Sequence, residues 1–167
     1  TGISNSGKTT ISNELEKKVK FMGYENVKNI DGDDFRKQIN NFLYDDNSRD
    51  KIGYIKLDRA REYILGGYSV IVSGIAYNKK WREEAKSKYE ELIEIYIKCP
   101  LTVCIDRDKS GSYKEALKGK KKNFIGVTDK YQEGKTADIE VNTEKLTVSE
   151  SVEKILQFLI KKRLLNG

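Results

Sequence analysis

Two hydrophobic patterns alternate along the chain, one with the period of a helix and one typical of buried strands. An apolar repeat at every third or fourth residue predicts a first helix over 9–22, which Gly23 would end. The β-branched run at 69–73 is typical of a central parallel strand. We expect further helices over 35–42, about 48–65, 79–89, 101–107 and from 149 onward, and further strands at 27–30, 92–98 and 137–141. This alternation predicts an α/β fold, a parallel sheet with helices on both faces.

Polar residues stand where several of these helices begin. Asp34 would cap the helix over 35–42, and Ser48 or Asn47 would cap the next one. The chain has 167 residues, without an internal repeat or a low-complexity linker. This length predicts one domain over 1–167.

The start of the chain carries the pattern G-x-x-x-x-G-K-[ST], which builds a phosphate-binding loop. Gly2 and Gly7 permit backbone angles that turn successive N–H groups toward phosphate oxygens at the start of a helix. Lys8 would reach the β- and γ-phosphates, and the Thr9 hydroxyl would bind Mg²⁺. The expected ATP-binding residues of this stretch are Gly2, Ser4, Asn5, Ser6, Gly7, Lys8, Thr9 and Thr10.

An alternative for the same stretch is a Gly/Ser turn that only starts a helix. The helical repeat that follows at once, over 9–22, favours the phosphate loop. Such a loop normally follows a buried strand. Because the chain begins at Thr1, we expect that first strand to be missing from this sequence.

A run of carboxylates follows the strand at 27–30, at the strand end where α/β proteins bind ligands. We expect Asp33 to orient Mg²⁺ or to accept a proton from an attacking hydroxyl. The alternative for these aspartates is helix capping alone, and we assign that role to Asp34.

The segment over 109–128 is rich in lysine and is interrupted by glycines. It is either an exposed basic helix or, as we favour, a mobile lid that closes over bound phosphates. Phe124, within this segment, would either stack on a base or only pin the loop.

Composition narrows the class of partner. The net charge of +6 comes from basic residues mixed with Glu and Asp, which suits a small polyanion such as ATP. No apolar run approaches the ~20 residues that span a bilayer, and no signal-peptide pattern is visible. Cys99 and Cys104 stand without any His, so zinc binding is implausible and we expect reduced, core-facing thiols in a cytoplasmic protein. We therefore expect neither nucleic acid nor a membrane as a partner.

Taken in order, the motifs of this chain resemble those of the adenylylsulfate (APS) kinase family, over nearly its whole length. The resemblance rests on the phosphate loop and on Asp31-Gly32-Asp33 with Arg36, Val70-Ile71-Val72-Ser73, Cys99-Pro100-Leu101-x-Val103-Cys104-x-x-Arg107-Asp108, Gly111-x-Tyr113 and Lys122-Asn123-Phe124-x-Gly126. It implies a three-layer P-loop NTPase fold of the nucleoside-monophosphate-kinase type, usually dimeric, so a homodimer is expected. It also implies an enzyme that uses ATP and Mg²⁺ to phosphorylate the ribose 3′-hydroxyl of a nucleotide.

The resemblance implies roles for individual residues as well. Lys8, Asp33 and Arg107 would be catalytic, and Arg107 would also belong to the ATP pocket. Thr9, Asp33 and Ser73 would hold Mg²⁺. The acceptor nucleotide would be bound by Asp31, Arg36, Arg49, Gly74, Ile75, Lys122, Asn123 and Phe124.

This chain departs from the family on the acceptor side. Where the family continues Glu-Asn-Ile-Arg-Arg, the stretch 48–55 keeps Arg49 but lacks the Asn and both following arginines. The Phe that would sandwich the acceptor's adenine is Gly74, and a following Ser is Ala76. In the lid, a usual Lys, Leu and Arg are replaced by Ser110, Ser112 and Leu117.

These departures predict a kinase with the family's donor side and a different acceptor. Cytidine diphosphoramidate, the acceptor of a related kinase branch in capsular polysaccharide synthesis, would fit a changed base and a less anionic end. The alternatives are an authentic APS kinase with a divergent pocket, a module that holds ATP without transferring phosphoryl groups, and a nucleic-acid-binding role.

Overall fold

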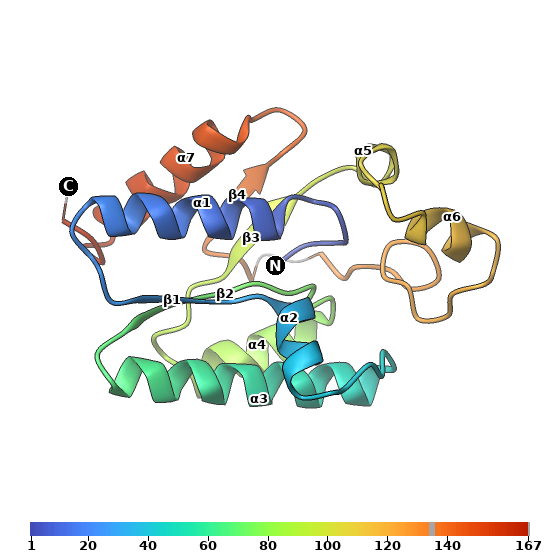
Figure 1. Cartoon of the computed structure of the whole chain (residues 1–167), viewed down its shortest axis with the longest axis horizontal. Coiled ribbons are helices and arrows are strands. Elements are labelled where there is room, and N and C mark those ends of the chain that lie inside the picture. The colour runs from blue at the N-terminus through green and yellow to red at the C-terminus, as the bar shows by residue number, and fades with distance from the viewer. Residues whose placement is uncertain (134–135, 167) are drawn as a thin grey trace.

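The computed structural model describes residues 1–133 and 136–166. Helices and strands alternate along most of the chain, as the hydrophobic pattern predicts. The elements are α1 (Lys8–Phe21), β1 (Val27–Ile30), α2 (Gly32–Gln38), α3 (Asp46–Leu65), β2 (Ser69–Val72), α4 (Lys79–Lys88), β3 (Ile95–Lys98), α5 (Leu101–Asp106), α6 (Ser112–Leu117), β4 (Ile139–Asn142) and α7 (Val148–Lys161) (Figure 1).

The strands form two parallel pairs. β1 pairs with β2, with Val27 opposite Ser69, and β3 pairs with β4. The backbone of Thr1 lies beside β3, because its carbonyl accepts a hydrogen bond of 2.8 Å from the N–H of Ile97. Its hydroxyl donates to the carbonyl of Ile75, just beyond β2. The first residue of the chain therefore links the two strand pairs at the edge where the phosphate loop begins.

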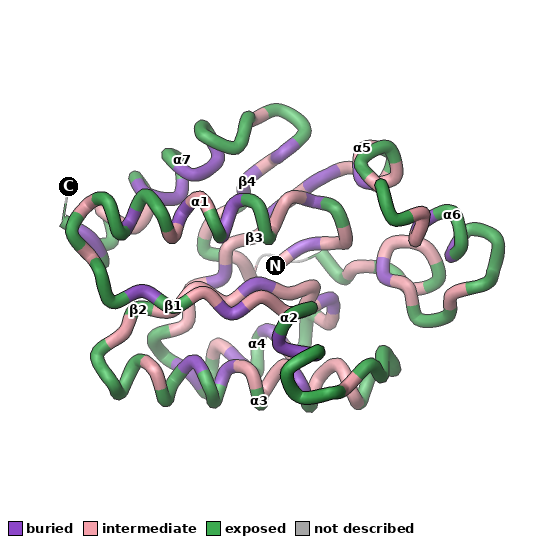
Figure 2. Tube along the Cα trace, viewed as in Figure 1, coloured by how far each residue is buried: buried purple, intermediate pink, exposed green. Residues whose placement is uncertain are grey.

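Helices cover both faces of these strands. α1 and α7 lie on one side, and α3 and α4 lie on the other (Figure 1). The buried positions of each helix face inward, toward the strands (Figure 2). The core beneath α1 and α7 is formed by Ile11, Leu15, Val19, Val27, Ile97, Val141, Val152, Ile155, Leu156 and Leu165. The layered α/β arrangement predicted from the alternation is therefore confirmed.

Two of the predicted helix caps are wrong. α2 begins after Asp31, whose side chain accepts hydrogen bonds from the N–H groups of Asp33 and Asp34, so Asp34 lies inside the first turn. α3 is capped by Asp45, which accepts from the N–H of Ser48. In both cases an aspartate nearer the preceding loop has the extended backbone that an N-cap requires. α2 also ends at Gln38, before the expected 42.

The first strand has the predicted boundaries, and the boundaries of the other strands differ from the prediction by one to three residues. β3 begins at Ile95, so Glu94 precedes the strand, and its carboxylate forms a 2.8 Å ion pair with Arg82. Both side chains are less than 10% exposed, at 8% and 4%. Because a buried charge requires a partner, this pair explains a glutamate in an otherwise apolar stretch. The two cysteines, expected to be reduced and core-facing, are both free and buried.

Candidate active site

The phosphate loop adopts a conformation that only glycine permits at its two ends. Gly2 and Gly7 have φ of 145° and 102°. A Cβ on Gly2 would clash with the carbonyl oxygen of Ile97 in β3. Gly7 is the left-handed N-cap of α1, so the loop runs directly into the N-terminus of that helix. This is the geometry that lets a helix N-terminus bind an anion, as the motif predicts.

The loop borders a cavity of about 1030 Å³, at the upper end of the roughly 300–1,000 Å³ typical of ligand pockets. The predicted site residues meet around it, although they come from six different parts of the chain. Two of them, Gly2 and Ser6, belong to the loop but do not line the cavity. The predicted residues that line it are Ser4, Asn5, Gly7, Lys8, Thr9, Thr10, Asp31, Asp33, Arg36, Arg49, Ser73, Gly74, Ile75, Arg107, Lys122, Asn123 and Phe124.

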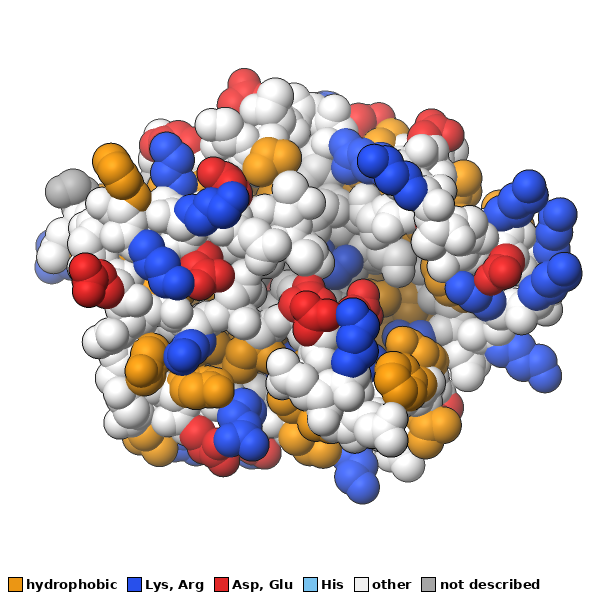
Figure 3. Space-filling view, in the orientation of Figure 1, with side chains coloured by type: hydrophobic (Ala, Val, Ile, Leu, Met, Phe, Trp, Pro, Cys, Tyr) orange, Lys and Arg blue, Asp and Glu red, His pale blue; other side chains and the backbone are white. Residues whose placement is uncertain are grey.

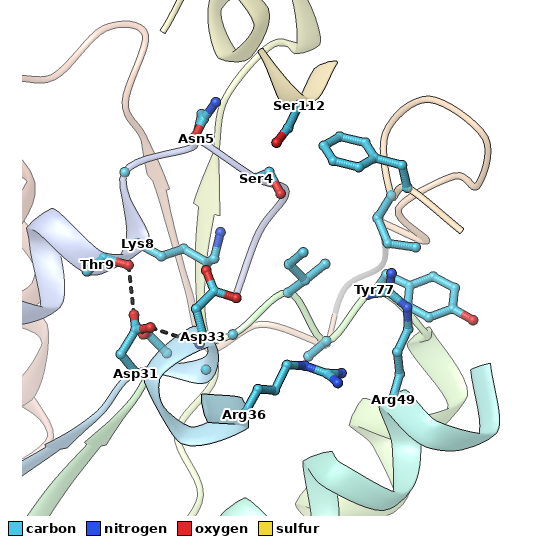
Figure 4. A pocket seen from close by; sticks show the side chains of 18 of the residues that line it. Ser4, Asn5, Lys8, Thr9, Asp31, Asp33, Arg36, Arg49, Tyr77 and Ser112 are labelled. Atoms are coloured by element: carbon cyan, nitrogen blue, oxygen red, sulfur yellow. Dashed lines mark hydrogen bonds between the residues drawn. The ribbon is translucent and has the colours of Figure 1, made fainter. Parts of the chain in front are cut away.

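Lys8 and Asp33 both line the cavity, and Figure 4 shows the Lys8 ammonium and the Asp33 carboxylate near one another. The ammonium of Lys8 donates a 2.6 Å hydrogen bond to the carbonyl of Ile3 within the loop. Burial lowers the pKa of Lys8 to about 8, and the negative charge of Asp33 partly opposes this shift. Lys8 could hold a phosphate group here, and the Asp33 carboxylate nearby could orient a hydroxyl that attacks it.

Asp31 joins the phosphate loop to the ends of both strands. One of its oxygens accepts hydrogen bonds from the hydroxyls of Thr9, at 2.8 Å, and Ser73, at 2.9 Å. The other accepts from the first N–H groups of α2. Partial burial works against the charged carboxylate, but these hydrogen bonds outweigh it and lower the pKa of Asp31. Asp31 therefore carries a negative charge beside the two hydroxyls predicted to bind Mg²⁺.

The donor set fits Mg²⁺. Thr9, Ser73, Asp31 and Asp33 offer hard oxygen atoms, which this ion prefers, and few protein ligands are needed because substrate phosphates complete its shell. Among residues 1–133 and 136–166, no group of three or more His, Cys, Asp or Glu could hold a metal on its own. Over the same residues, no helix combines the length and apolarity that crossing a bilayer requires.

Elsewhere on the cavity wall, two arginines lie close to one aromatic ring. Arg36 lies 4.5 Å from the centre of the Tyr44 ring, and Arg49 lies 5.3 Å from it. Arg36 donates to the carbonyl of Leu43 at 2.7 Å, and Arg49 donates to the carbonyls of Tyr44 and Asn123. Figure 4 shows both arginines pointing into the cavity from α2 and α3. Arg49 therefore connects the loop before α3 to the lysine-rich segment.

The lysine-rich segment forms the side of the cavity near α6. Lys and Arg side chains gather at the edge of the molecule over this part of the chain (Figure 3). The ring of Phe124 packs edge-on against Tyr113, with centroids 4.9 Å apart, and also lines the cavity. Lys121 is bound to Ser112 and Glu115 within the segment, whereas Lys122 is exposed at the cavity's edge. Movement of the segment as a lid stays a prediction.

Arg107 reaches the cavity from the end of α5. Its guanidinium donates to the carbonyl of Thr143 at 2.7 Å and to the hydroxyl of the same residue at 3.3 Å. The Thr143 hydroxyl in turn donates to the carbonyl of Ser6. Arg107 is thus fixed beside the phosphate loop, where the ATP side of the cavity was predicted.

Sequence reasoning missed Lys56, whose ammonium lines the cavity and donates to the carbonyl of Ser73 at 3.0 Å. Burial lowers its pKa to about 8. The signal was present in the helical period, because Lys56 stands midway between Ile52 and Ala60, both 5% exposed, on the inner face of α3. Three aromatic residues that line the cavity were also missed, namely Tyr44, Tyr77 and Trp81.

Comparison with known proteins identifies this arrangement. The family model described as adenylylsulphate kinase matches residues 1–142. The adenylyl-sulfate kinase of Halothermothrix orenii is 36% identical over 176 residues, which cover 99% of this chain and 90% of that protein.

Solved structures agree on the fold. The APS kinase of Mycobacterium tuberculosis in complex with AMPPNP and APS superposes with a TM-score of 0.84 at 24% identity, covering 95% of this chain and 94% of that one. A hexameric APS kinase from Thiobacillus denitrificans gives a TM-score of 0.69 at 21% identity, covering 99% of this chain and 29% of that one. Together with the family match, they confirm the P-loop NTPase fold. The chain belongs to the adenylylsulphate kinase family, P-loop enzymes that use ATP with Mg²⁺ to phosphorylate a hydroxyl group.

Proposed function

We propose that this kinase transfers the γ-phosphoryl group of ATP to the ribose 3′-hydroxyl of a small nucleotide whose base is not adenine. Cytidine diphosphoramidate, used in the synthesis of capsular polysaccharides, is the best candidate. The observation that carries the proposal is the Gly74 position. It offers no side chain to stack on a base, and the ammonium of Lys56 lies where a side chain would begin.

The residues around the cavity suit in-line phosphoryl transfer. Lys8 would bind the β- and γ-phosphates, and Asp33 would orient the attacking hydroxyl and accept its proton. Thr9, Ser73 and the charged Asp31 would hold Mg²⁺, which supplies neutralisation of phosphate charge. Asp31 was predicted to bind the acceptor. Its hydrogen bonds to the two hydroxyls favour a role on the metal side instead.

The cations on the acceptor wall suit the diphosphate of such a substrate. Arg36 and Arg49 both lie close to the Tyr44 ring and line the cavity. Both arginines match the family's pattern, whereas the two arginines that usually follow Arg49 are absent. We expect the glycine at position 74 to affect acceptor choice more, because it removes an apolar side chain on which the base could stack.

An acceptor screen tests the proposal. The purified protein is incubated with ATP and Mg²⁺ and with cytidine diphosphoramidate or APS, and the product is identified by mass spectrometry and ³¹P NMR. We expect kcat/KM to be at least about tenfold higher with the cytidine acceptor, equivalent to about 1.4 kcal/mol. A preference for APS would instead identify an authentic APS kinase, the function that the names of its relatives favour.

The screen also decides between an enzyme and an ATP-binding module without transfer. No phosphorylated product with either nucleotide, while ATP still binds, would support the module. The Asp33→Ala variant provides the negative control, because it keeps the phosphate loop and removes the proposed general base.

The assembly and the location belong to the same proposal. We propose a homodimer that acts in the cytoplasm, where its nucleotide substrates are found. Light scattering coupled to size-exclusion chromatography measures the mass in solution. A mass near three or six times that of the chain, 19.2 kDa, would contradict the dimer.

A further inference from the structure

We infer that Lys56 reads the base of the acceptor nucleotide, by donating a hydrogen bond from its ammonium to a carbonyl oxygen of a pyrimidine ring that lies against Gly74. The inference rests on the proposed function and names the substrate class of the same site. Lys56 would be a specificity-determining residue and would take no part in proton transfer.

Lys56 occupies a position that the fold would otherwise give to an apolar residue. It lies between Ile52 and Ala60 on the inner face of α3, and those two residues pack into the core beneath β1 and β2. Its side chain passes this core and places the ammonium at the floor of the cavity, beside Gly32 and Gly74. A lysine held against a core is expensive to desolvate, so an alkyl side chain would be the better choice for stability alone.

The Lys56 ammonium has N–H groups that no protein acceptor binds among the described residues. Among the described residues it makes one hydrogen bond, to the carbonyl of Ser73, and no ion pair within 4 Å. An ammonium carries three N–H groups, and a neutral carbonyl satisfies only one of them. The two others lie at a cavity wall, where an oxygen atom of a bound molecule could accept them.

Gly74 and Lys56 fit one another. A Cβ on Gly74 would lie 2.5 Å from the Lys56 ammonium nitrogen, so a side chain there would displace the lysine. Gly74 does not have a positive φ, so its backbone conformation does not require glycine. Glycine is needed at this position because a side chain would occupy the space of the Lys56 ammonium. The floor of the cavity at this point is therefore bare backbone with a cation at its edge, which suits a flat ring that carries a hydrogen-bond acceptor at its rim.

The hydrogen-bond acceptors at the edge of the ring differ between pyrimidine bases and adenine. Cytosine and uracil both carry a carbonyl oxygen next to the ring nitrogen that bears the ribose, whereas adenine has no carbonyl oxygen. A charge-assisted N–H···O bond is roughly twice as strong as a neutral one, and an unpaired ammonium facing adenine would lose its hydration without this compensation. The expected preference is therefore for pyrimidine nucleotides over adenine nucleotides.

Equilibrium binding of cytidine and adenosine monophosphates tests this directly. AMPPNP and Mg²⁺ at saturation keep the donor side filled, so the monophosphates report on the acceptor side. Trp81 is the single tryptophan of the chain and lines the cavity, so its fluorescence provides the signal, with calorimetry as a check. We expect Lys56→Met to weaken cytidine monophosphate binding at least about tenfold and to change adenosine monophosphate binding less than about threefold.

The matched control is Lys51→Met, an exposed lysine on the same helix that does not line the cavity, and it should change neither affinity. Gly74→Ala provides a second variant, because its methyl group displaces the ammonium and should have the same selective effect. Circular dichroism melting checks that each variant folds. Equal weakening of both monophosphates by Lys56→Met would mean that the ammonium contacts the phosphate, and would overturn the inference. So would unchanged cytidine monophosphate binding.

The two levels of the proposal fail separately. A wild-type protein that phosphorylates only APS overturns the proposed function. A wild-type protein that phosphorylates the cytidine acceptor, together with a Lys56→Met variant of unchanged base preference, overturns only the role of Lys56.

Discussion

The donor side and the acceptor side of the cavity are built in different ways. On the donor side, short side chains and backbone groups at the ends of β1 and β2 and the start of α1 contact one another directly, as in the hydrogen bonds of Asp31 to Thr9 and Ser73. On the acceptor side, long side chains reach the cavity from α2 and α3 and bind loop carbonyls, as Arg36 and Arg49 do. The contrast teaches that the donor geometry is fixed by the strands, whereas the acceptor wall can change without disturbing it.

The largest expected effect comes from Asp33, which stands between the two sides. Asp33→Ala should lower kcat by about 10²–10⁴-fold, the range for losing a general base, and leave the affinity for ATP within about threefold. Steady-state kinetics and ATP titration measure the two quantities. Asp34→Ala is the matched control, because the neighbouring carboxylate pairs with Lys37 and does not line the cavity. Near-native turnover of Asp33→Ala would remove this residue from the mechanism.

A change confined to the donor side should act through the metal. Asp31→Asn keeps the shape of the side chain but removes the charge beside Thr9 and Ser73. The Mg²⁺ concentration for half-maximal activity should rise about 10–100-fold, as for other groups that support a metal site. Asp45→Asn, at the cap of α3 outside the cavity, should leave the Mg²⁺ requirement unchanged. An unchanged requirement in Asp31→Asn would return Asp31 to the acceptor side.

A change confined to the acceptor side should leave ATP untouched. Phe124→Ala removes a ring that lines the cavity, and a stacked base is worth about 1–3 kcal/mol. The KM for the acceptor should therefore rise about 5–150-fold, while the KM for ATP stays within about twofold. Phe42→Ala, an exposed aromatic outside the cavity, is the control. Parallel increases in both KM values would show that the ring supports the whole lid and not the acceptor alone.

The smallest expected effect is the uptake of less than one proton per ATP molecule bound. Burial lowers the pKa of Lys8 to about 8, and a bound triphosphate would raise the pKa again by stabilising the charged form. ATP binding should therefore take up protons near pH 8.5, where part of Lys8 is neutral, and take up almost none near pH 6.5. Calorimetry in two buffers of different ionisation enthalpy measures the uptake. Because Lys56 also has a pKa of about 8, the experiment is repeated in Lys56→Met.

The charge-retaining variant Lys8→Arg gives the control, since arginine stays protonated across this range. Its proton uptake near pH 8.5 should vanish. Uptake that persists in Lys8→Arg would assign the proton to another group.

Much of the donor side could be predicted from local sequence. The phosphate loop and α1 occupy adjacent residues, so their geometry depends on glycine positions and a helical repeat that can be read directly. Asp33 was predicted from the end of a strand, because parallel strands present their carboxyl ends to one edge, whereas the role of Ser73 was implied by the family resemblance. The predicted caps at Asp34 and Ser48 were wrong because several polar residues stand near each helix start, and the backbone angles decide among them.

The alternation of helices and strands, the phosphate loop and the family could all be read from the amino-acid sequence. These follow from periodicity and from residues close together in the chain. Tertiary structure was needed to show that Lys56 reaches the cavity beside Gly74, that Arg36 and Arg49 both lie near Tyr44, and that Glu94 pairs with Arg82. Each of these contacts joins residues from different elements, so it depends on how those elements pack, which no local pattern contains.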